Sequence, residues 1–451
     1  MSRFKPIKRD MNYLFPPSMS DWLPESHLAR FVVEIVEQLD LKPMERAYGT
    51  SGSAPFHPAL LLSILVYGYA TGVFSSRKLE NATYDSVAFR FVAADEHPDH
   101  DTLNTFRKRF LKEIEGLMVQ VLMIARTLGA LNLGNIALDG SKFKANASKH
   151  SAMSYAHIKK LEEQLKEEVE KLMELAEAAD NEKIPDGMNL PEEIARREDR
   201  IQAIAEAKAK IEARAKERFE QEQSEHRNKL DNREAKAEES GKKPRGKPPV
   251  PPVDGARDKD QINFTDDESR IMKVSDGGFD QCYNSQIAVD MASMLIVTTN
   301  TVQACNDKQQ IEAILERLDA LPAELGKPEH LVADTGYFSG ANVNACGERE
   351  ITPLIAVKRE GHHPDPMARF TEPPPLKEGA TEVDKMRHSL LTMAGRAIYA
   401  KRKCTVEPVF GIIKAILGFR QFSLRGLENV KGEFNLVAMA WNLKRMFVLA
   451  G

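Results

Sequence analysis

Three acidic residues occur where their carboxylates could act together. Asp139 ends the apolar run that starts at Asn135, and Asp334 ends the run that starts at His330, so each is predicted at the end of a buried strand. Glu407 lies in a segment with the spacing of an amphipathic helix. Three convergent carboxylates without histidine or cysteine partners are hard oxygen ligands, which suit Mg²⁺ or Mn²⁺ rather than zinc. Two such ions about 4 Å apart can activate an attacking oxygen and stabilise the leaving one in phosphodiester displacement.

The helix predicted around Glu407 has two different faces. Its apolar positions make one stripe: Val406, Val409, Phe410, Ile413 and Leu417. Lys403, Glu407 and Lys414 fall on another face, where an acid and an ammonium about 10 Å apart suit a metal and a phosphate. Pro408 predicts that the helix begins near Thr405 or kinks there. A plain surface helix with a Lys403–Glu407 pair is the alternative.

Other acids and histidines have simpler interpretations. Asp290 and Asp307 could be accessory acids of the site, but the sequence favours a turn for one and a helix cap for the other. His362 and His363 stand beside prolines in a polar stretch, which favours a solvated turn over a metal site. Asp139 alone would also be read as a turn former, and only its combination with Asp334 and Glu407 favours the catalytic interpretation.

The composition is that of a water-soluble intracellular protein with two or three domains. The chain has 451 residues, of which 42% are hydrophobic and 29% charged. We expect no membrane association, because no apolar run reaches the roughly 18 residues of a spanning helix. The N-terminus has no signal-peptide pattern, so a cytoplasmic, nucleoid-associated location is expected. The four cysteines are widely spaced, which predicts reduced, buried thiols rather than disulfides or a zinc knuckle.

Charge is distributed unevenly along the chain. The net charge is only −4, yet from Arg387 to the end 11 basic residues stand against 3 acidic ones. Residues 151–240 show the opposite balance, with 17 basic and 24 acidic residues. The basic C-terminal segment is the electrostatic pattern expected for contact with phosphate backbones. Lys403, Lys414, Arg420 and Arg425 are predicted to neutralise a scissile DNA strand there.

The chain divides into three predicted parts. Residues 1–131 read as an all-α DNA-end-binding domain, in which 102–110 could serve as the second helix of a helix-turn-helix, with Asp101 as its N-cap and Arg107 and Lys108 facing DNA. A solvated helix face is the alternative interpretation there. Residues 132–150 and 254–451 read as a mixed α/β catalytic domain. Residues 151–253 read as a helical-hairpin insertion that closes with a Pro-rich basic tether.

The order Asp139, Asp334, Glu407, together with Tyr399-x-x-Arg402-x4-Glu407-x6-Lys414, resembles the DDE transposases of bacterial insertion sequences. Phe56-His57-Pro58 and Ser75-Ser76-Arg77-Lys78-Leu79 resemble the N-terminal domain of one insertion-sequence group. Val406-Glu407-Pro408-Val409-Phe410-Gly411 and Arg425-Gly426 resemble its C-terminal end. The family signature usually has three residues between its arginine and glutamate, whereas Arg402 leaves four and Lys403 leaves three, so either base fits that role.

The resemblance implies an RNase H-like core whose three acids hold Mg²⁺ or Mn²⁺, two ions in all. Water would nick double-stranded DNA at the terminal inverted repeats, and the released 3′-hydroxyl would attack target DNA. Tyr399, Arg402 and Lys414 would contact phosphates near the cut, and the protein would act as a homodimer on DNA. Two alternatives remain: an RNase H-like nuclease without strand transfer, and a catalytically silent DNA-binding derivative. For the insertion we expect dimerisation or DNA clamping.

Overall fold

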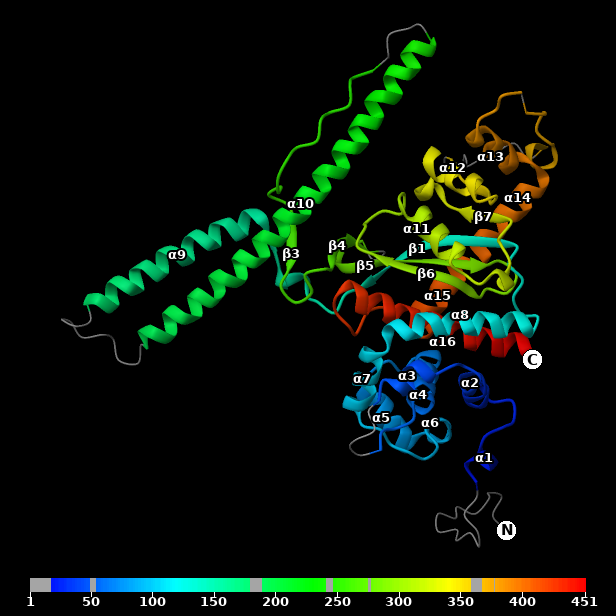
Figure 1. The fold of residues 1–451 in the computed structure, drawn as a ribbon, viewed down its shortest axis with the longest axis horizontal. Helices are drawn as coiled ribbons and strands as arrows, with labels where there is room; N and C mark the ends of the chain where they lie inside the picture. The colour runs from blue at the N-terminus through cyan, green and yellow to red at the C-terminus, as the bar shows by residue number, and fades with distance from the viewer. Residues whose placement is uncertain are drawn as a thin grey trace, which may run out of the picture. The chain divides into compact units, whose positions relative to one another are not determined.

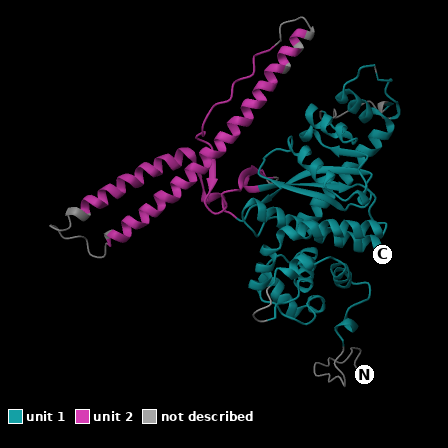
Figure 2. Ribbon diagram, in the orientation of Figure 1, with its two compact units in different colours: residues 1–146, 283–451 teal, residues 147–282 magenta. Residues whose placement is uncertain are grey.

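The computed structural model describes residues 18–48, 54–178, 189–240, 246–274, 277–357, 367–376 and 378–451. The chain forms two compact units (Figures 1 and 2): a core unit, Met1–Asn146 with Tyr283–Gly451, and an insertion unit, Ala147–Cys282. His362 and His363, for which a solvated turn was predicted, lie outside the described residues. The insertion unit is longer than the predicted 151–253.

The first part of the core unit is helical, as its patterning predicts. Its helices are α1 (Met19–Trp22), α2 (Leu28–Glu37), α3 (Lys42–Arg46), α4 (Pro58–Thr71), α5 (Ser76–Asp85), α6 (Val87–Val92), α7 (His100–Arg109) and α8 (Leu111–Thr127). Helix α4 opens at Pro58, where the missing amide hydrogen costs nothing. It is buried over nearly its whole length and contacts α2 and the last helix, α16 (Leu427–Ala450).

A mixed sheet forms the centre of the core unit. Its strands are β1 (Asn135–Lys144), β5 (Phe279–Asp290), β6 (Ile296–Val302), β7 (His330–Ala333) and β8 (Thr352–Ile355). The order runs β5-β1-β7-β8, with β6 also paired to β5, while β4 (Arg270–Lys273) pairs with the first residues of β5. Strands β1, β7 and β8 are parallel, and β5 and β6 form an antiparallel hairpin. The sheet confirms the expected mixed α/β, RNase H-like core behind a helical N-terminal region.

One boundary in this sheet differs from the prediction. Asp139 does not end its strand, because β1 continues to Lys144. The extension is held by the burial of Phe143 and by backbone hydrogen bonds of Lys144 with Arg420 and Phe422. Long-range pairing therefore keeps polar residues extended that the local sequence marks as a turn.

Helices cover the sheet and complete the core unit. They are α11 (Gln310–Asp319), α12 (Gly340–Glu348), α13 (Glu382–Leu391), α14 (Met393–Ala400), α15 (Val406–Gly411) and α16. Helix α16 lies beside α8 and packs on β6 (Figure 1). The buried Asn442 side chain bonds both the amide and the carbonyl of Ile296 at 2.8 Å, as a neighbouring strand would. This contact protects an edge strand that would otherwise expose unpaired groups.

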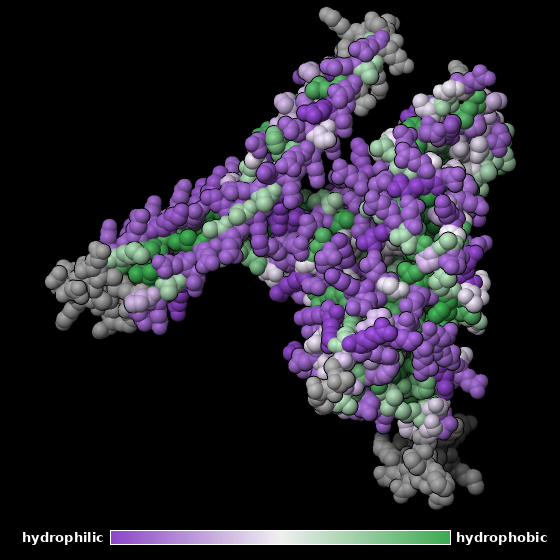
Figure 3. Space-filling model, viewed as in Figure 1, coloured by the Kyte–Doolittle hydropathy of each residue, from purple (hydrophilic) through white to green (hydrophobic). Residues whose placement is uncertain are grey.

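The insertion unit is built on two long helices, α9 (Tyr155–Ala178) and α10 (Leu190–Ser240). Its core contains Ile158, Leu165, Ile204, Ala207 and Ile211, joined by Ile262. Ile262 belongs to β3 (Gln261–Asn263), which pairs antiparallel with β2 (Ala152–Ser154). Figure 3 shows the resulting apolar seam between two otherwise hydrophilic helices. The predicted hairpin arms are thus present, and α10 continues well beyond Ile211, where fraying was expected.

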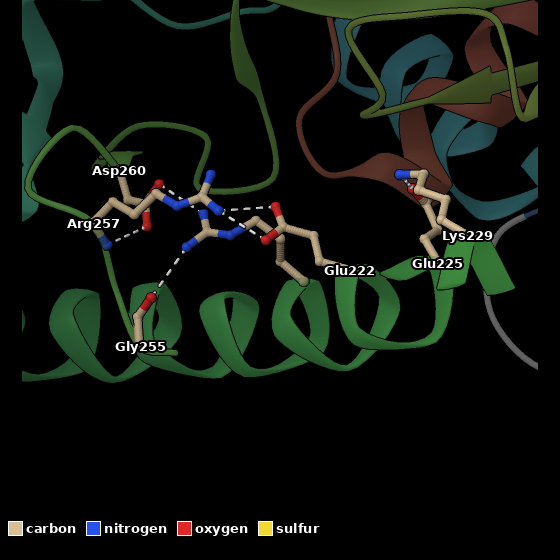
Figure 4. Close-up of polar contacts among 7 residues, drawn as sticks. Glu222, Glu225, Lys229, Gly255, Arg257 and Asp260 are labelled. Atoms are coloured by element: carbon tan, nitrogen blue, oxygen red, sulfur yellow. Dashed lines mark hydrogen bonds and ion pairs between the residues drawn. The ribbon is translucent and has the colours of Figure 1, made fainter. Parts of the chain in front are cut away.

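The chain returns along α10 instead of forming a loose tether. Arg233 donates to the Lys247 and Gly246 carbonyls at 2.8 and 2.7 Å. Farther along, Nη2 of Arg257 donates to both carboxylate oxygens of Glu222 (Figure 4), at 2.9 and 2.8 Å. The described part of the Pro-rich segment is therefore bound to the helix by side chains, although Val250 and Val253 are exposed.

Two further sequence predictions can be compared with the structure. Within the described residues no single helix is long and apolar enough to cross a membrane; α4 and α5 meet the criterion only together, with a 96° bend between them. The cysteines are free, as predicted, but Cys305 and Cys404 are exposed while Cys282 and Cys346 are buried. Burial raises the pKa of the Cys346 thiol to about 12.

Candidate active site

The pairing of β1 with β7 brings Asp139 and Asp334 together. The parallel register sets Ile136 against Leu331 and Ala137 against Val332. The same register, continued by two residues, sets Asp139 beside Asp334, and neighbouring strands lie about 4.8 Å apart. Asp334 directly follows β7, as predicted, and its Oδ1 accepts a 2.7 Å hydrogen bond from the Gly336 amide.

Arg402 connects Asp139 with Glu407. Its guanidinium lies 3.5 Å from Asp139 Oδ2 and 3.2 Å from Glu407 Oε1. The arginine side chain is only 10% exposed, whereas Glu407 is 49% exposed. The structure therefore brings all three predicted acids into one region. The base that pairs with Glu407 is Arg402 and not Lys403, which is exposed.

The segment that carries Glu407 is not one regular helix. It starts as a 3₁₀ turn (Lys401–Cys404), becomes α15, and continues as a π-helical turn (Ile412–Ile416). The predicted apolar stripe is confirmed by burial of Val406, Val409, Phe410, Ile413 and Leu417. The mixed helix types change the angular relation of Glu407 and Lys414, because each type has its own number of residues per turn.

Lys414, in the π-helical turn, contacts the C-terminal half of β1. Its ammonium donates to Ser141 Oγ at 2.7 Å and to the Lys142 carbonyl at 2.6 Å. It also lies 4.3 Å from the centroid of the Phe143 ring, within cation–π range. Asp139 thus lies near the middle of β1, and Lys414 contacts the same strand at Ser141 and Lys142.

Burial and neighbouring acids perturb Asp139. The pKa of its carboxyl is raised to about 6: burial is the largest cause, the Gly140 amide and Arg402 lower the pKa, and the charges of Asp334 and Asp307 raise it. Burial also raises the pKa of Tyr337 well above its usual value, with further raising by Asp307, Asp139 and Asp334. These shifts place Asp307 in the same electrostatic environment as the predicted acids.

For Asp307 the structure differs from the favoured helix-cap interpretation. The residue precedes α11, but its side chain does not cap that helix: Oδ1 accepts from Asn284 at 2.8 Å and from Gln286 at 2.6 Å, both on β5. Gln286 in turn accepts a hydrogen bond from the Tyr337 hydroxyl. The available signal was the run of polar residues within β5, a strand that is otherwise apolar and is buried along most of its length.

The remaining predicted DNA contacts differ in exposure. Lys403, Arg420 and Arg425 are exposed, and Tyr399, on α14, is half-buried. Backbone carbonyls hold the two arginines: Arg420 donates to Lys414 at 2.9 Å and Arg425 donates to Asn146 at 3.0 Å. Their contacts with DNA stay predictions.

The prediction for Arg107 is wrong. Arg107 is 4% exposed and donates to the Tyr69 hydroxyl at 3.0 Å, and Tyr69 in turn donates to Glu433 at 3.1 Å. It is a buried structural residue that cannot reach a DNA phosphate. Lys108, its neighbour on α7, is exposed. The N-cap of α7 is also not Asp101 but Asp99, which accepts from the Thr102 amide at 2.6 Å.

The donor set fits a divalent cation by its chemistry. In the described part of the chain, no three His, Cys, Asp or Glu side chains already gather in the manner of a metal site. Instead the Arg402 guanidinium stands between Asp139 and Glu407 and supplies positive charge there. The oxygen donors suit Mg²⁺ or Mn²⁺, and Arg402 must move if a cation is to reach both carboxylates.

Comparison with known families agrees with this geometry. Residues 253–443 match the family model described as Transposase DDE domain, which includes Asp334 and Glu407. Residues 17–109 match the model described as Transposase domain. The chain is a DDE transposase of the insertion-sequence type. No curated protein and no solved structure gives a significant match.

The family fixes the general chemistry of this transposase. DDE transposases are DNA-binding proteins of the nuclease and transposase class and generally use divalent metal ions. Asp139 lies outside both matched ranges. Its place beside Asp334 follows from the strand register and from the electrostatic effect of Asp334 on its carboxyl.

Proposed function

We propose that this transposase cleaves double-stranded DNA at the terminal inverted repeats of its element and joins the freed 3′-hydroxyl to target DNA. The observations that support the proposal are the strand register that sets Asp139 beside Asp334 and the contacts of Arg402, in the basic C-terminal segment, with both Asp139 and Glu407. Carboxylates grouped with bases are the components that phosphodiester displacement requires.

In this proposal Asp139, Asp334 and Glu407 hold Mg²⁺ or Mn²⁺, two ions in all. When bound, the ions would supply activation of the attacking oxygen and stabilisation of the leaving oxygen. Arg402 exchanges its two carboxylates for a DNA phosphate. Lys403, Lys414, Arg420 and Arg425 neutralise the strand near the cut, and Tyr399 contacts a phosphate beside them.

The decisive assay uses a supercoiled plasmid that carries the element's own two ends. We expect nicking by the wild type in Mg²⁺ or Mn²⁺, and a loss of at least about 100-fold in Asp334→Asn, with DNA binding retained in a gel shift. Glu316→Gln is the matched control, because Glu316 is an exposed acid on α11. Equal nicking by Asp334→Asn and wild type would remove Asp334 from the site.

Strand transfer is tested with pre-cut ends and a target plasmid. Joined products that depend on a 3′-hydroxyl support the transposase reaction. Nicks without joined products would favour the RNase H-like nuclease, and DNA binding without either product would favour a silent derivative.

The helical N-terminal domain is proposed to recognise the inverted repeats, through exposed residues such as Lys108. We also propose a homodimer on DNA, with the insertion unit as an element of dimerisation or clamping. Sedimentation velocity of the full chain, with and without end DNA, measures the oligomeric state. A monomer in both conditions would contradict the dimer.

A further inference from the structure

Asp307 approaches the acids of the site from a separate loop between β6 and α11. A Cβ atom on Gly140, the residue after Asp139, would stand 2.7 Å from Asp307 Oδ1. A Cβ atom on Gly336, two residues after Asp334, would stand 2.9 Å from Asp334 Oδ1 and 3.9 Å from Asp307 Oδ2. The Asp307 carboxylate thus reaches from the Asp139 strand to the Asp334 turn.

The hydrogen bonds of Asp307 orient it in a specific way. The two side-chain amides of Asn284 and Gln286 both donate to Oδ1, at 2.8 and 2.6 Å. Gln286 is itself fixed by the buried Tyr337 hydroxyl. Oδ2 lies on the side of Gly336. One oxygen is therefore anchored to β5 while the other lies toward the turn that follows Asp334, the arrangement of an oriented ligand.

The glycines make this approach possible. At Gly140 any side chain would overlap the Gln286 amide and Asp307. At Gly336 a side chain would press against Asp334. Gly140 thus leaves space for the Asp307 carboxylate beside Asp139, and Gly336 leaves space for the Asp334 carboxylate.

Electrostatics add a reason to expect a cation here. Asp307, Asp139 and Asp334 repel one another in a partly buried region, and amide donors offset only part of one negative charge. Arg402 contacts Asp139 and Glu407 and offsets part of this charge. A divalent cation among Asp139, Asp307 and Asp334 would compensate the remaining charge.

We propose that Asp307 is a fourth acidic residue of the active site, which supplies a carboxylate oxygen to the divalent cation bound by Asp139 and Asp334. This inference rests on the proposed function, since it concerns the same metal. It assigns to the Asn284–Gln286–Tyr337 network the task of orienting that ligand.

The test is Mn²⁺ binding to the full-length protein without DNA, measured by isothermal titration calorimetry and by the rise in unfolding temperature with Mn²⁺. Asp307→Asn keeps an oxygen that can accept from both amides but removes the charge. We expect its Mn²⁺ affinity to fall about tenfold or more, with the metal-free unfolding temperature unchanged or higher. Asn284→Ala, which loosens the network but keeps the carboxylate, should lose less, and Glu316→Gln should bind like wild type.

The possible results separate the two proposals. If Asp334→Asn loses Mn²⁺ binding while Asp307→Asn binds like wild type, Asp307 is no ligand and the proposed function stands. If Asn284→Ala loses as much affinity as Asp307→Asn, and both lower the metal-free unfolding temperature, Asp307 is structural and the inference is overturned. If Mn²⁺ does not bind to the wild type, the metal assignment of the proposed function fails as well.

Discussion

Replacing Asp139 with asparagine should make the metal-free protein more stable. In the folded protein the pKa of Asp139 is raised from 3.8 to about 6, so the folded state favours the protonated carboxyl. The contribution of Asp139 to the free energy of unfolding is therefore most favourable at low pH, and it declines as pH rises from about 4 to about 6. The difference between these two pKa values corresponds to about 3 kcal/mol of lost stability above pH 6. Asp139→Asn, which stays neutral, avoids that cost.

The measurement is urea unfolding in EDTA, followed by tryptophan fluorescence at pH 8, 5 and 3. Both tryptophans, Trp22 and Trp441, belong to the core unit, so the signal reports on the unit that holds the site. We expect Asp139→Asn to exceed wild type by about 3 kcal/mol at pH 8, by about half of that near pH 5, and by almost nothing at pH 3. Glu316→Gln should follow wild type throughout. A variant that is no more stable than wild type at pH 8, or an advantage independent of pH, would refute the reasoning.

Other substitutions test the remaining contacts. Gly140→Ala should cost about 1–3 kcal/mol in urea unfolding, because its methyl group overlaps the Asp307 network. Arg107→Met should cost about 3–5 kcal/mol by leaving Glu433 buried without its cationic neighbour, whereas Lys108→Ala should change stability by less than about 0.5 kcal/mol and lower DNA affinity in a gel shift. Lys414→Met should keep the packing on Phe143 but reduce end cleavage about 10-fold or more in the plasmid assay.

Local patterning was sufficient where one segment determines its own environment. The apolar run before Asp334 is a strand, and Pro58 opens α4, because burial and backbone chemistry act within a few residues. The stripe from Val406 to Leu417 is buried for the same reason. The helix types within that stripe were not predictable, because each of the 3₁₀, α and π segments is too short to show a period of its own.

Prediction failed where a residue's partner is distant in the sequence. Arg107 lies in a polar segment typical of a surface helix. It is nevertheless buried, with a hydrogen bond to Tyr69, which in turn donates to Glu433. Asp307 looks like a helix cap, but its side chain accepts from two amides on β5 instead. Asp139 seems to end its strand because Gly140 and Ser141 follow, while the pairing that extends β1 comes from residues near Phe422. Such contacts are properties of the tertiary fold and leave no local periodicity.

The Arg402 bridge has a consequence for when this enzyme can act. A guanidinium between Asp139 and Glu407 competes with metal for the same oxygens, and a phosphodiester backbone competes with those oxygens for the guanidinium. Affinity for nucleic acid and affinity for the ion should then rise together by the same factor, as thermodynamic linkage requires. Under the proposed function, the protein without DNA would therefore bind the ion more weakly, and cleavage would be favoured at DNA ends that are already bound.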